Sequence, residues 1–242
     1  MNPPLLDVSG LGKRFGGFVA LEAIDLRVTE GERIGLIGPN GSGKSTLVNC
    51  LSGTLRNETG QVRFAGRLLD GMAAHQRTRL GLARSFQLPR PFRSLTVAEN
   101  LQIPIEYVVH ARGEGRVDVP ARCAELLDLV GLAGRGEELP AGLTQVEMRK
   151  LELARAMAAE PRLLIADEAM AGLSHQEVDD ILALLLALND RGVTIIMIEH
   201  IMRAVMGFSQ RLVVLVAGRK IADGNPEEVI RNPEVERAYL GE

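Results

Sequence analysis

The residues with the clearest chemistry form a glycine-rich run that ends in a lysine and two hydroxyl side chains. The run, Gly38-Pro39-Asn40-Gly41-Ser42-Gly43-Lys44-Ser45-Thr46, matches the phosphate-binding pattern G-x-x-x-x-G-K-[ST]. Glycines in such a loop let backbone N–H groups approach phosphate oxygens. In this pattern Lys44 holds the β- and γ-phosphates and Ser45 is a ligand of Mg²⁺. The run therefore predicts a site for the phosphates of a nucleotide and its Mg²⁺.

The chain on either side of this loop predicts the elements that must position it. Arg33–Ile37, before the loop, is a largely apolar run that follows a Glu30-Gly31 turn. After the loop, apolar residues repeat at helical spacing from Leu47 up to Gly53. The order of strand, loop and helix places the loop at a helix N-terminus, where the helix dipole favours negative charge. The alternative is an accidental glycine-rich turn, which this order disfavours.

Two acidic residues follow a second apolar run. Residues 163–166 are typical of a buried strand, and Asp167-Glu168 comes directly after them. Taken alone, an Asp-Glu pair after a strand more often begins a helix. With a phosphate loop upstream, we expect the strand to deliver both carboxylates to the ligand crevice. Asp167 would then serve Mg²⁺, usually through water, and Glu168 would position or activate the attacking water.

A histidine follows a third apolar run. Residues 193–198 are typical of a strand, and Glu199-His200 comes directly after them. A histidine at a strand end is more often a capped or core residue than a functional one. The carboxyl edge of a parallel sheet, where the phosphates would lie, favours a functional role for His200.

Length and composition limit the class of protein. The 242 residues suit one large domain, and 46% hydrophobic with 24% charged residues is close to the globular average. A net charge of −3 and 3% aromatic residues give no argument for nucleic acid as a partner. Two cysteines, Cys50 and Cys123, form no metal-ligand spacing or disulfide framework, which fits a reducing cytoplasm.

No membrane-targeting segment is expected. The N-terminus lacks a basic stretch followed by an apolar core, so we expect no signal peptide. The longest apolar run, residues 181–188, is too short to span a bilayer. Any membrane association must therefore go through a partner.

Between these sites the chain predicts a small antiparallel sheet and a helical insertion. Short β-like pieces occupy residues 5–29, and residues 61–66 add another strand and turn. Residues 88–155 are predicted as the helical insertion. Its first segment, residues 88–95, holds two prolines beside Arg and Phe. That segment is either a surface loop that binds a partner or a plain connector.

Local signals also predict several element boundaries. Thr96 with Glu99, and Ser174 with Glu177, have the spacing of capping boxes at helix starts. A hairpin is expected over residues 212–221. Asn225-Pro226 then predicts a terminal helix with proline at its first position.

Taken together, these motifs resemble the ATP-hydrolysing subunits of ABC transporters, specifically the bacterial branched-chain amino-acid importer type. The resemblance runs nearly end to end, and residues 222–229 and 232–241 look especially like that importer branch. It rests on Gly38–Thr46 as Walker A, Gln87 in Arg84-Ser85-Phe86-Gln87 as the Q-loop, Asp167-Glu168 as Walker B with the catalytic Glu, and His200 as the switch His.

The resemblance implies an α/β fold in one ABC ATPase domain over residues 1–242. This fold is a P-loop NTPase core with a mostly parallel sheet, an antiparallel β-subdomain and a helical subdomain at residues 88–155. The resemblance also implies ATP as the nucleotide, with Lys44, Gln87, Glu168 and His200 in catalysis. The implied magnesium ligands are Ser45, Gln87 and Asp167.

The resemblance also suggests what holds the adenine. Phe15 matches the family's adenine-stacking aromatic, and Val19 is a plausible second contact. A lone Phe is otherwise more often a core residue, so only the resemblance favours this role for Phe15.

The resemblance further implies partners and a location. Two such chains meet head to tail with ATP between them, and transmembrane permease subunits are the other direct partners. A periplasmic or extracellular solute-binding protein is an indirect partner, and no nucleic acid is involved. The chain would be cytoplasmic, peripheral on the cytoplasmic face of the cell membrane, and would power import of branched-chain amino acids or related small solutes.

The sequence departs from the family in the segment that completes a neighbour's ATP site. Alignment of residues 150–156 puts Leu143-Thr144-Gln145-Val146-Glu147 in the place of the LSGGQ signature. Thr144 keeps the hydroxyl, whereas Val146 stands where the family has Gly and Glu147 where it has Gln. These changes are expected to weaken closure over the opposing ATP, which favours a heterodimer with unequal sites over a homodimer.

Three further positions differ near the catalytic residues. Ala169 replaces the Pro after the catalytic Glu, Ser174 replaces an acid in the next loop, and Ile201 replaces an acid after the switch His. They put the contribution to the opposing ATP site in question, while the chain's own half-site is complete.

Two other functions remain open at this point. A soluble ABC-type ATPase acting on nucleic acid or translation, or an exporter motor, would share these motifs. The soluble relatives typically carry two cassettes or long insertions, and this chain has neither. A small-molecule P-loop kinase would need an acceptor pocket, and it explains neither Gln87 nor His200.

Overall fold

The large sheet brings the predicted site residues to one edge. In the computed structural model, which describes residues 3–86, 88–113 and 117–240, six strands form this sheet in the order β10-β9-β3-β8-β7-β6. Neighbouring strands are parallel except at the pair of β10 with β9. The strands are β3 (Arg33–Ile37), β6 (Leu82–Ser85), β7 (Leu163–Asp167), β8 (Thr194–Ile198), β9 (Arg211–Val216) and β10 (Arg219–Gly224).

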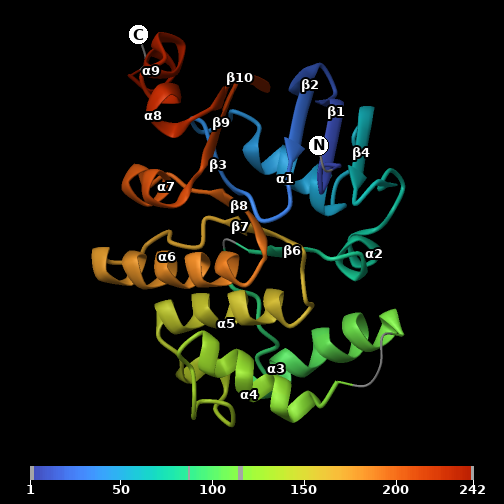
Figure 1. Cartoon of the computed structure of the whole chain (residues 1–242), viewed down its shortest axis with the longest axis vertical. Coiled ribbons are helices and arrows are strands. Elements are labelled where there is room, and N and C mark those ends of the chain that lie inside the picture. Colours follow the sequence, from blue (N-terminus) through green and yellow to red (C-terminus); the bar gives the residue numbers. More distant parts are fainter. Residues whose placement is uncertain (1–2, 87, 114–116, 241–242) are drawn as a thin grey trace.

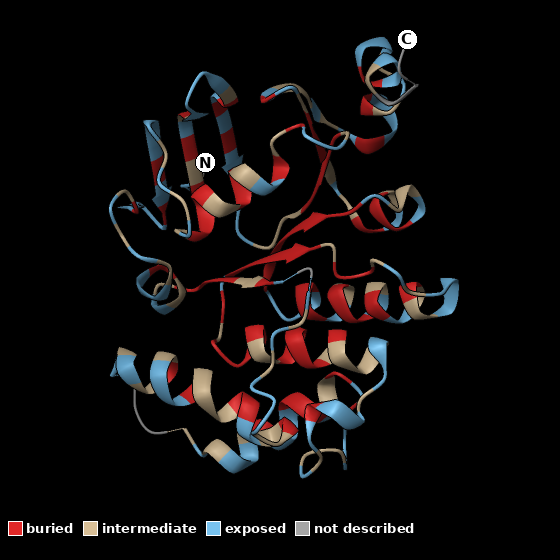
Figure 2. Ribbon diagram, turned by 180° about the vertical axis from the view of Figure 1, so that it is seen from behind, coloured by how far each residue is buried: buried red, intermediate tan, exposed pale blue. Residues whose placement is uncertain are grey.

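The central strands are buried on both faces, as Figure 2 shows by their colour. Along β8, Ile195 and Met197 belong to a hydrophobic cluster on one face, and Ile196 and Ile198 belong to a second cluster on the other. Successive side chains of a strand point to opposite faces, so a strand covered on both sides must be apolar throughout. This is why the strands before Asp167 and Glu199 have continuous apolar sequences.

A smaller antiparallel sheet covers one side of the molecule, as the sequence predicted. Its order is β2-β1-β4-β5. Its strands are β1 (Leu6–Phe15), β2 (Phe18–Val28), β4 (Thr59–Phe64) and β5 (Arg67–Leu68). The amide of Glu22 in β2 donates to the carbonyl of Gly218 at 2.8 Å. This bond ties the small sheet to the turn between β9 and β10.

Helices cover both faces of the large sheet. In Figure 1, α5 and α6 lie side by side beneath it, and α3 and α4 lie beyond α5. The α-helices are α1 (Lys44–Ser52), α2 (Ala74–Arg79), α3 (Val97–Pro104), α4 (Val119–Leu129), α5 (Gln145–Met157), α6 (His175–Asp190), α7 (Met202–Phe208), α8 (Pro226–Val229) and α9 (Pro233–Leu240). Short helical turns occupy η1 (Ile105–Val109), η2 (His110–Arg112) and η3 (Pro140–Gly142).

Most predicted boundaries are confirmed. Capping boxes join Thr96 to Glu99 at the start of α3 and Ser174 to Glu177 at the start of α6. The hairpin of β9 and β10 and the cap on α8 also agree with the sequence. Helix α7 and the π-helical turn η1 were not predicted, since neither has a cap or repeat strong enough to distinguish it from a loop.

Helices α3, α4 and α5 pack together within the predicted helical insertion. The amides of Val97 and Ala98 donate to Glu138 and Gly136 at 2.8 and 2.9 Å, which fixes the start of α3 against the chain before α5. Leu153 of α5 lies in the same core cluster as Leu164 of the sheet. Because α5 packs both on α3 and α4 and on the large sheet, it does not mark an end of the helical insertion. The boundary at residues 88–155 therefore stays a prediction.

The buried guanidinium of Arg77 in α2 anchors the last turn of α1. Its Nη1 donates to the carbonyls of Cys50 at 2.7 Å and Leu51 at 2.8 Å, and its Nη2 donates to that of Leu69 at 3.1 Å. Carbonyls at a helix C-terminus lack partners within the helix. Arg77 supplies those partners and so holds the helix that follows the glycine-rich loop.

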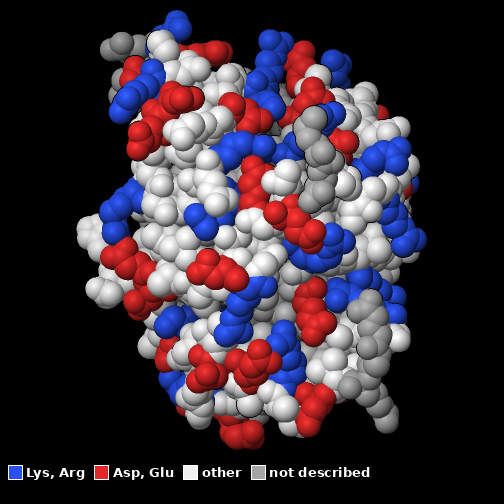
Figure 3. Space-filling model, viewed as in Figure 1, with Lys and Arg blue, Asp and Glu red and all other residues white. Residues whose placement is uncertain are grey.

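In the described part of the chain, no helix combines the length and the apolar character that crossing a bilayer requires. On the face drawn in Figure 3, basic and acidic side chains are interspersed. Both cysteines are free and buried.

Candidate functional site

The glycine-rich loop runs from the end of β3 to the first turn of α1, as predicted. Gly43 has φ 103° and immediately precedes α1. A Cβ on Gly43 would lie 2.7 Å from the carbonyl oxygen of Ala20, and one on Gly38 would lie 2.1 Å from that of Leu215. Both positions therefore exclude any larger residue. The glycines let the loop turn tightly between the two sheets and leave its amides at a helix N-terminus.

Lys44 is buried within this loop. Its Nζ donates to the carbonyl oxygens of Gly38 at 2.6 Å and Pro39 at 3.1 Å. Burial lowers the pKa of Lys44, while the nearby charges of Glu168 and Asp167 act to raise it. The amine thus lies among loop carbonyls and near two carboxylates, in position to exchange carbonyl contacts for phosphate oxygens.

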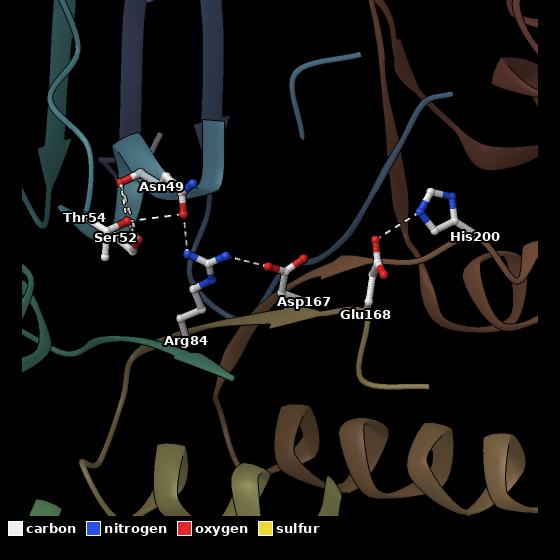
Figure 4. A network of polar contacts seen from close by, with 7 residues as sticks. All are labelled: Asn49, Ser52, Thr54, Arg84, Asp167, Glu168 and His200. Carbon is white, nitrogen blue, oxygen red and sulfur yellow. Dashed lines mark hydrogen bonds and ion pairs between the residues drawn. The ribbon is translucent and has the colours of Figure 1, made fainter. Parts of the chain in front are cut away.

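Glu168 and His200 come together from neighbouring strands. In β7 and β8, Asp167 is paired with Ile198, so the residues after both strands emerge side by side. His200 Nε2 lies 3.1 Å from Glu168 Oε1 (Figure 4). Glu168 has φ 47°, a left-handed conformation that costs a non-glycine residue energy and is found at functional sites. Its amide donates to the Ile198 carbonyl at 2.9 Å.

A hollow of about 250 Å³ collects most of the predicted site residues. The residues that line it come from the loop, the small sheet and the two strand ends: Phe15, Phe18, Ala20, Asn40, Gly41, Ser42, Gly43, Lys44, Ser45, Thr46, Glu168 and His200. The ring of Phe15 is half exposed, and Lys13 Nζ lies 5.4 Å from its centroid. Phe15 is therefore a surface aromatic at the site and not the core residue that a lone Phe usually is.

Val19, predicted as a second adenine contact, does not line this hollow. It lines a different hollow with Lys13 and Glu58, while Phe18 and Ala20 line the one that holds the glycine-rich loop. The physical reason is the alternation of side chains along a strand, which turns Val19 away from the face of its two neighbours. The Gly16-Gly17 turn was the missed signal, because a two-residue hairpin pairs Phe15 with Phe18.

Asp167 forms an ion pair that the sequence did not predict. Its Oδ2 accepts from Arg84 Nη2 at 2.6 Å, and Arg84 Nη1 donates to Asn49 Oδ1 at 2.7 Å (Figure 4). Asp167 is buried, and so is most of the Arg84 side chain. No local pattern links Arg84 to Asp167, which is 83 residues away.

The donor set suits magnesium held jointly with nucleotide phosphates. Ser45 offers an exposed hydroxyl and Asp167 a carboxylate, both of the oxygen type that Mg²⁺ prefers. Within the described residues, no cluster of three or more His, Cys, Asp or Glu could hold a metal by itself. A magnesium site needs no such cluster, because one or two carboxylates can act with substrate phosphates and water. Gln87, also predicted as a ligand and catalytic residue, lies outside the described residues.

Glu199 holds the segment that follows Glu168. Its buried Oε1 accepts from the amide of Met170 at 2.8 Å, and Arg149 Nη2 donates to the Ala171 carbonyl at 3.2 Å. Burial raises the pKa of Glu199. Neither Glu199 nor Arg149 had a predicted role. Their contacts fix the chain between Glu168 and α6 from two sides.

Thr144 lies at the start of α5 and does not belong to the residues that line the hollow. Its hydroxyl accepts from the amide of Glu147 at 3.3 Å, while Glu147 accepts from the amide of Thr144 at 2.8 Å and from Arg135 at 2.5 Å. The hydrogen bond from the Thr144 backbone and the Arg135 charge lower the pKa of Glu147. The extra acid therefore serves as a helix cap with a basic partner.

Comparisons with known families agree with this geometry. Residues 21–171 match the family model described as ABC transporter, and residues 219–242 match the model described as branched-chain amino acid ATP-binding cassette transporter. The chain is 39% identical to the high-affinity branched-chain amino acid transport ATP-binding protein LivG of Salmonella typhimurium, over the full length of both chains. It is 38% identical to BraF of Pseudomonas aeruginosa, which carries the same description, again over the full length of both.

Solved structures show the same fold. A nucleotide-free ATP-binding cassette from an ABC transporter matches with a TM-score of 0.87 and 29% identity, covering 99% of this chain and 100% of that one. A cassette in its ADP conformation also matches with a TM-score of 0.87 and 29% identity, over the full length of both chains. These likenesses confirm the predicted α/β fold class.

Replacing Phe15 with Ala should weaken ATP binding about tenfold, because aromatic stacking on a base contributes roughly 1–3 kcal/mol and about 1.4 kcal/mol corresponds to a factor of ten. Tripolyphosphate, which has no base, should bind the variant as it binds the parent chain. Val19→Ala is the matched control and should leave both affinities unchanged. Titration calorimetry measures all of them, and equal ATP affinity in the parent chain and Phe15→Ala would remove Phe15 from the site.

Proposed function

The chain belongs to the ABC transporter ATPase family, and we propose that it is the ATP-hydrolysing subunit that powers a membrane importer of branched-chain amino acids or related small solutes. One observation carries the ATPase assignment: the glycine-rich loop, Glu168, His200 and Phe15 line one hollow. Full-length likeness to LivG and BraF supports import over an exporter motor or a soluble ATPase. It also supports import over a small-molecule kinase.

The proposed reaction is in-line attack of water on the γ-phosphate of ATP. Glu168 accepts a hydrogen bond from the attacking water and orients it, while His200 donates to a γ-phosphate oxygen. Lys44 and the loop amides stabilise the negative charge of the β- and γ-phosphates, and their burial strengthens this interaction. Phe15 stacks on the adenine. When bound, Mg²⁺ neutralises phosphate charge, with Ser45, Asp167 and Gln87 as the residues proposed to hold it.

The 3.1 Å contact between Glu168 and His200 supports their joint role. A histidine held against a carboxylate is fixed in orientation, so it can direct its other ring nitrogen toward phosphate. The strained backbone of Glu168 keeps its carboxylate at the strand end. This preorganisation lowers the cost of assembling charges around the γ-phosphate.

We propose that hydrolysis requires a second ATPase chain. The capped N-terminus of α5, with Thr144 exposed on it, is not part of this chain's own hollow. A helix N-terminus attracts anions, so this segment is suited to face the γ-phosphate bound by a partner. The departures from the family signature at Val146 and Glu147 favour a different partner chain over a second copy of this chain.

A groove of about 310 Å³ supports the proposed docking of a permease. It lies between the sheet edge and the helical insertion, and Phe86, Phe92 and Tyr107 contribute exposed aromatic rings to it. Fully buried Asn100 holds the loop by accepting from the Phe92 amide at 2.8 Å and donating to the Phe92 carbonyl at 3.1 Å. Exposed aromatics on a preformed loop have the character of interface anchors. Docking there would place the chain on the cytoplasmic face of the membrane, with a solute-binding protein as an indirect partner.

Glu168→Gln should bind ATP normally but hydrolyse it very slowly, because the amide keeps the size of the side chain and loses the charge that orients water. We expect an ATP-held dimer with the partner ATPase chain. Size-exclusion chromatography with and without Mg-ATP measures it, with Lys44→Ala as the variant that should not associate. A Glu168→Gln chain that stays monomeric beside its partner and ATP would contradict the assignment.

Phe92→Ala should reduce transport-coupled ATPase activity in the reconstituted importer at least tenfold, in keeping with an interface anchor. The ring is 44% exposed and packs on Arg155 with a centroid distance of 5.2 Å, so the melting temperature should change little. The matched control is Leu68→Ala, which truncates an exposed side chain on β5. If Phe92→Ala instead lowers the melting temperature strongly, the ring has a structural role.

The two ATP sites of the assembled pair should turn over at different rates. Val146 places a β-branched side chain where close approach to phosphate favours Gly, so the site completed by this chain's α5 should be the slower one. Removing the catalytic Glu from one chain at a time in the reconstituted pair measures each site. Equal losses would refute the asymmetry. Val146→Gly should raise activity, and Val146→Ala separates the effect of side-chain bulk from that of backbone freedom.

A further inference from the structure

The guanidinium of Arg84 joins the helix after the glycine-rich loop to the end of strand β7. Arg84 lies on β6, the outermost strand beside β7, where it pairs with Ile165. Nη1 reaches Asn49 of α1 at 2.7 Å and Nη2 reaches Asp167 at 2.6 Å. Figure 4 shows the Arg84 guanidinium between the side chains of Asn49 and Asp167.

This two-point attachment restricts the orientation of Asp167. A guanidinium is planar, and two hydrogen bonds from different nitrogens fix its plane. Asp167 is then held through Oδ2 in a largely buried setting, which restricts its orientation. Mg²⁺ demands nearly ideal octahedral geometry, so the orientation of a carboxylate that serves it matters.

The same guanidinium also forms part of the wall of the docking groove. Its central carbon lies 5.3 Å from the centroid of the Phe86 ring, and both residues line the groove with Phe92 and Tyr107. Arg84 therefore contacts the proposed permease surface on one side and the proposed magnesium carboxylate on the other.

We propose that Arg84 is a positioning residue that orients Asp167 for the magnesium ion of Mg-ATP. The inference rests on the proposed function, because it needs ATP in the hollow and Mg²⁺ beside Asp167. Arg84 touches neither nucleotide nor metal and acts only through the carboxylate. Since its guanidinium packs against Phe86, a segment docked in the groove and the magnesium site act on one side chain.

Two effects of Arg84 oppose each other, and a charge-conserving variant separates them. The positive charge repels Mg²⁺, whereas the fixed orientation of Asp167 favours Mg²⁺ binding. Arg84→Lys keeps the charge, but one ammonium on a flexible stem cannot fix a planar bridge between Asn49 and Asp167. A rise in the Mg²⁺ concentration that gives half of the maximal effect in this variant would therefore report the loss of orientation alone.

The experiment measures ATP affinity of the full chain by calorimetry, first with excess EDTA and then at increasing Mg²⁺. For Arg84→Lys, affinity for metal-free ATP should stay within about twofold of the parent chain, while the Mg²⁺ concentration giving half of the maximal effect should rise about tenfold, the usual cost of losing a residue that orients a metal ligand. Asn49→Ala leaves the ion pair and removes one anchor. It should shift the Mg²⁺ dependence in the same direction by a smaller factor.

Arg90→Lys is the matched control. Arg90 lies over the same Phe86 ring at 5.8 Å, but its hydrogen bonds to Glu152 and Arg155 use main-chain atoms. Its Mg²⁺ dependence should equal that of the parent chain.

The possible outcomes separate this inference from the proposed function. A parent chain that binds no ATP would overturn the proposed function. A parent chain that binds Mg-ATP, beside a folded Arg84→Lys and a folded Asn49→Ala with unchanged Mg²⁺ dependence, would overturn the positioning role alone. A lower half-maximal Mg²⁺ concentration in Arg84→Lys would also overturn it, because Arg84 would then compete with the metal for Asp167.

Discussion

The parallel alignment of β3, β8 and β7 is the constraint on which the rest of the structure depends. Hydrogen bonds in register along these strands bring the glycine-rich loop, Glu168 and His200 to one edge, although the residues are far apart in sequence. The register is held by packing, because both faces of the sheet are buried and a slip by one residue would set side chains of different size and shape against each covering layer. The geometry of the candidate site is thus a consequence of core packing.

Charged residues near the site are arranged in pairs that fix orientation. Asp167 is held by Arg84, Glu168 by its contact with His200, and Glu147 by Arg135. A buried carboxylate without a partner would be costly, and a hydrogen-bonding partner fixes its direction. The compensated Glu147 shows that an unusual residue in the segment predicted as the signature can be accommodated locally, so the proposed steric effect rests on Val146, which packs partly buried against the core.

The proposed docking groove and the proposed magnesium site share the strand at the sheet edge. Strand β6 contributes Arg84, whose side chain reaches both. Asn100 holds the backbone of Phe92, so a partner that docks in the groove would meet a preformed surface there.

The sequence by itself determined the loop, the strand ends, the capping boxes and the antiparallel sheet, because each has a local pattern of glycine, apolar or capping residues. Phe18 and Ala20 line the hollow in place of Val19 because of the strand pairing that the Gly16-Gly17 turn sets, a signal present in the sequence but not used. Only the structure decided that Arg84 meets Asp167. That contact depends on two strands folding side by side from distant parts of the chain, and no local pattern contains this information.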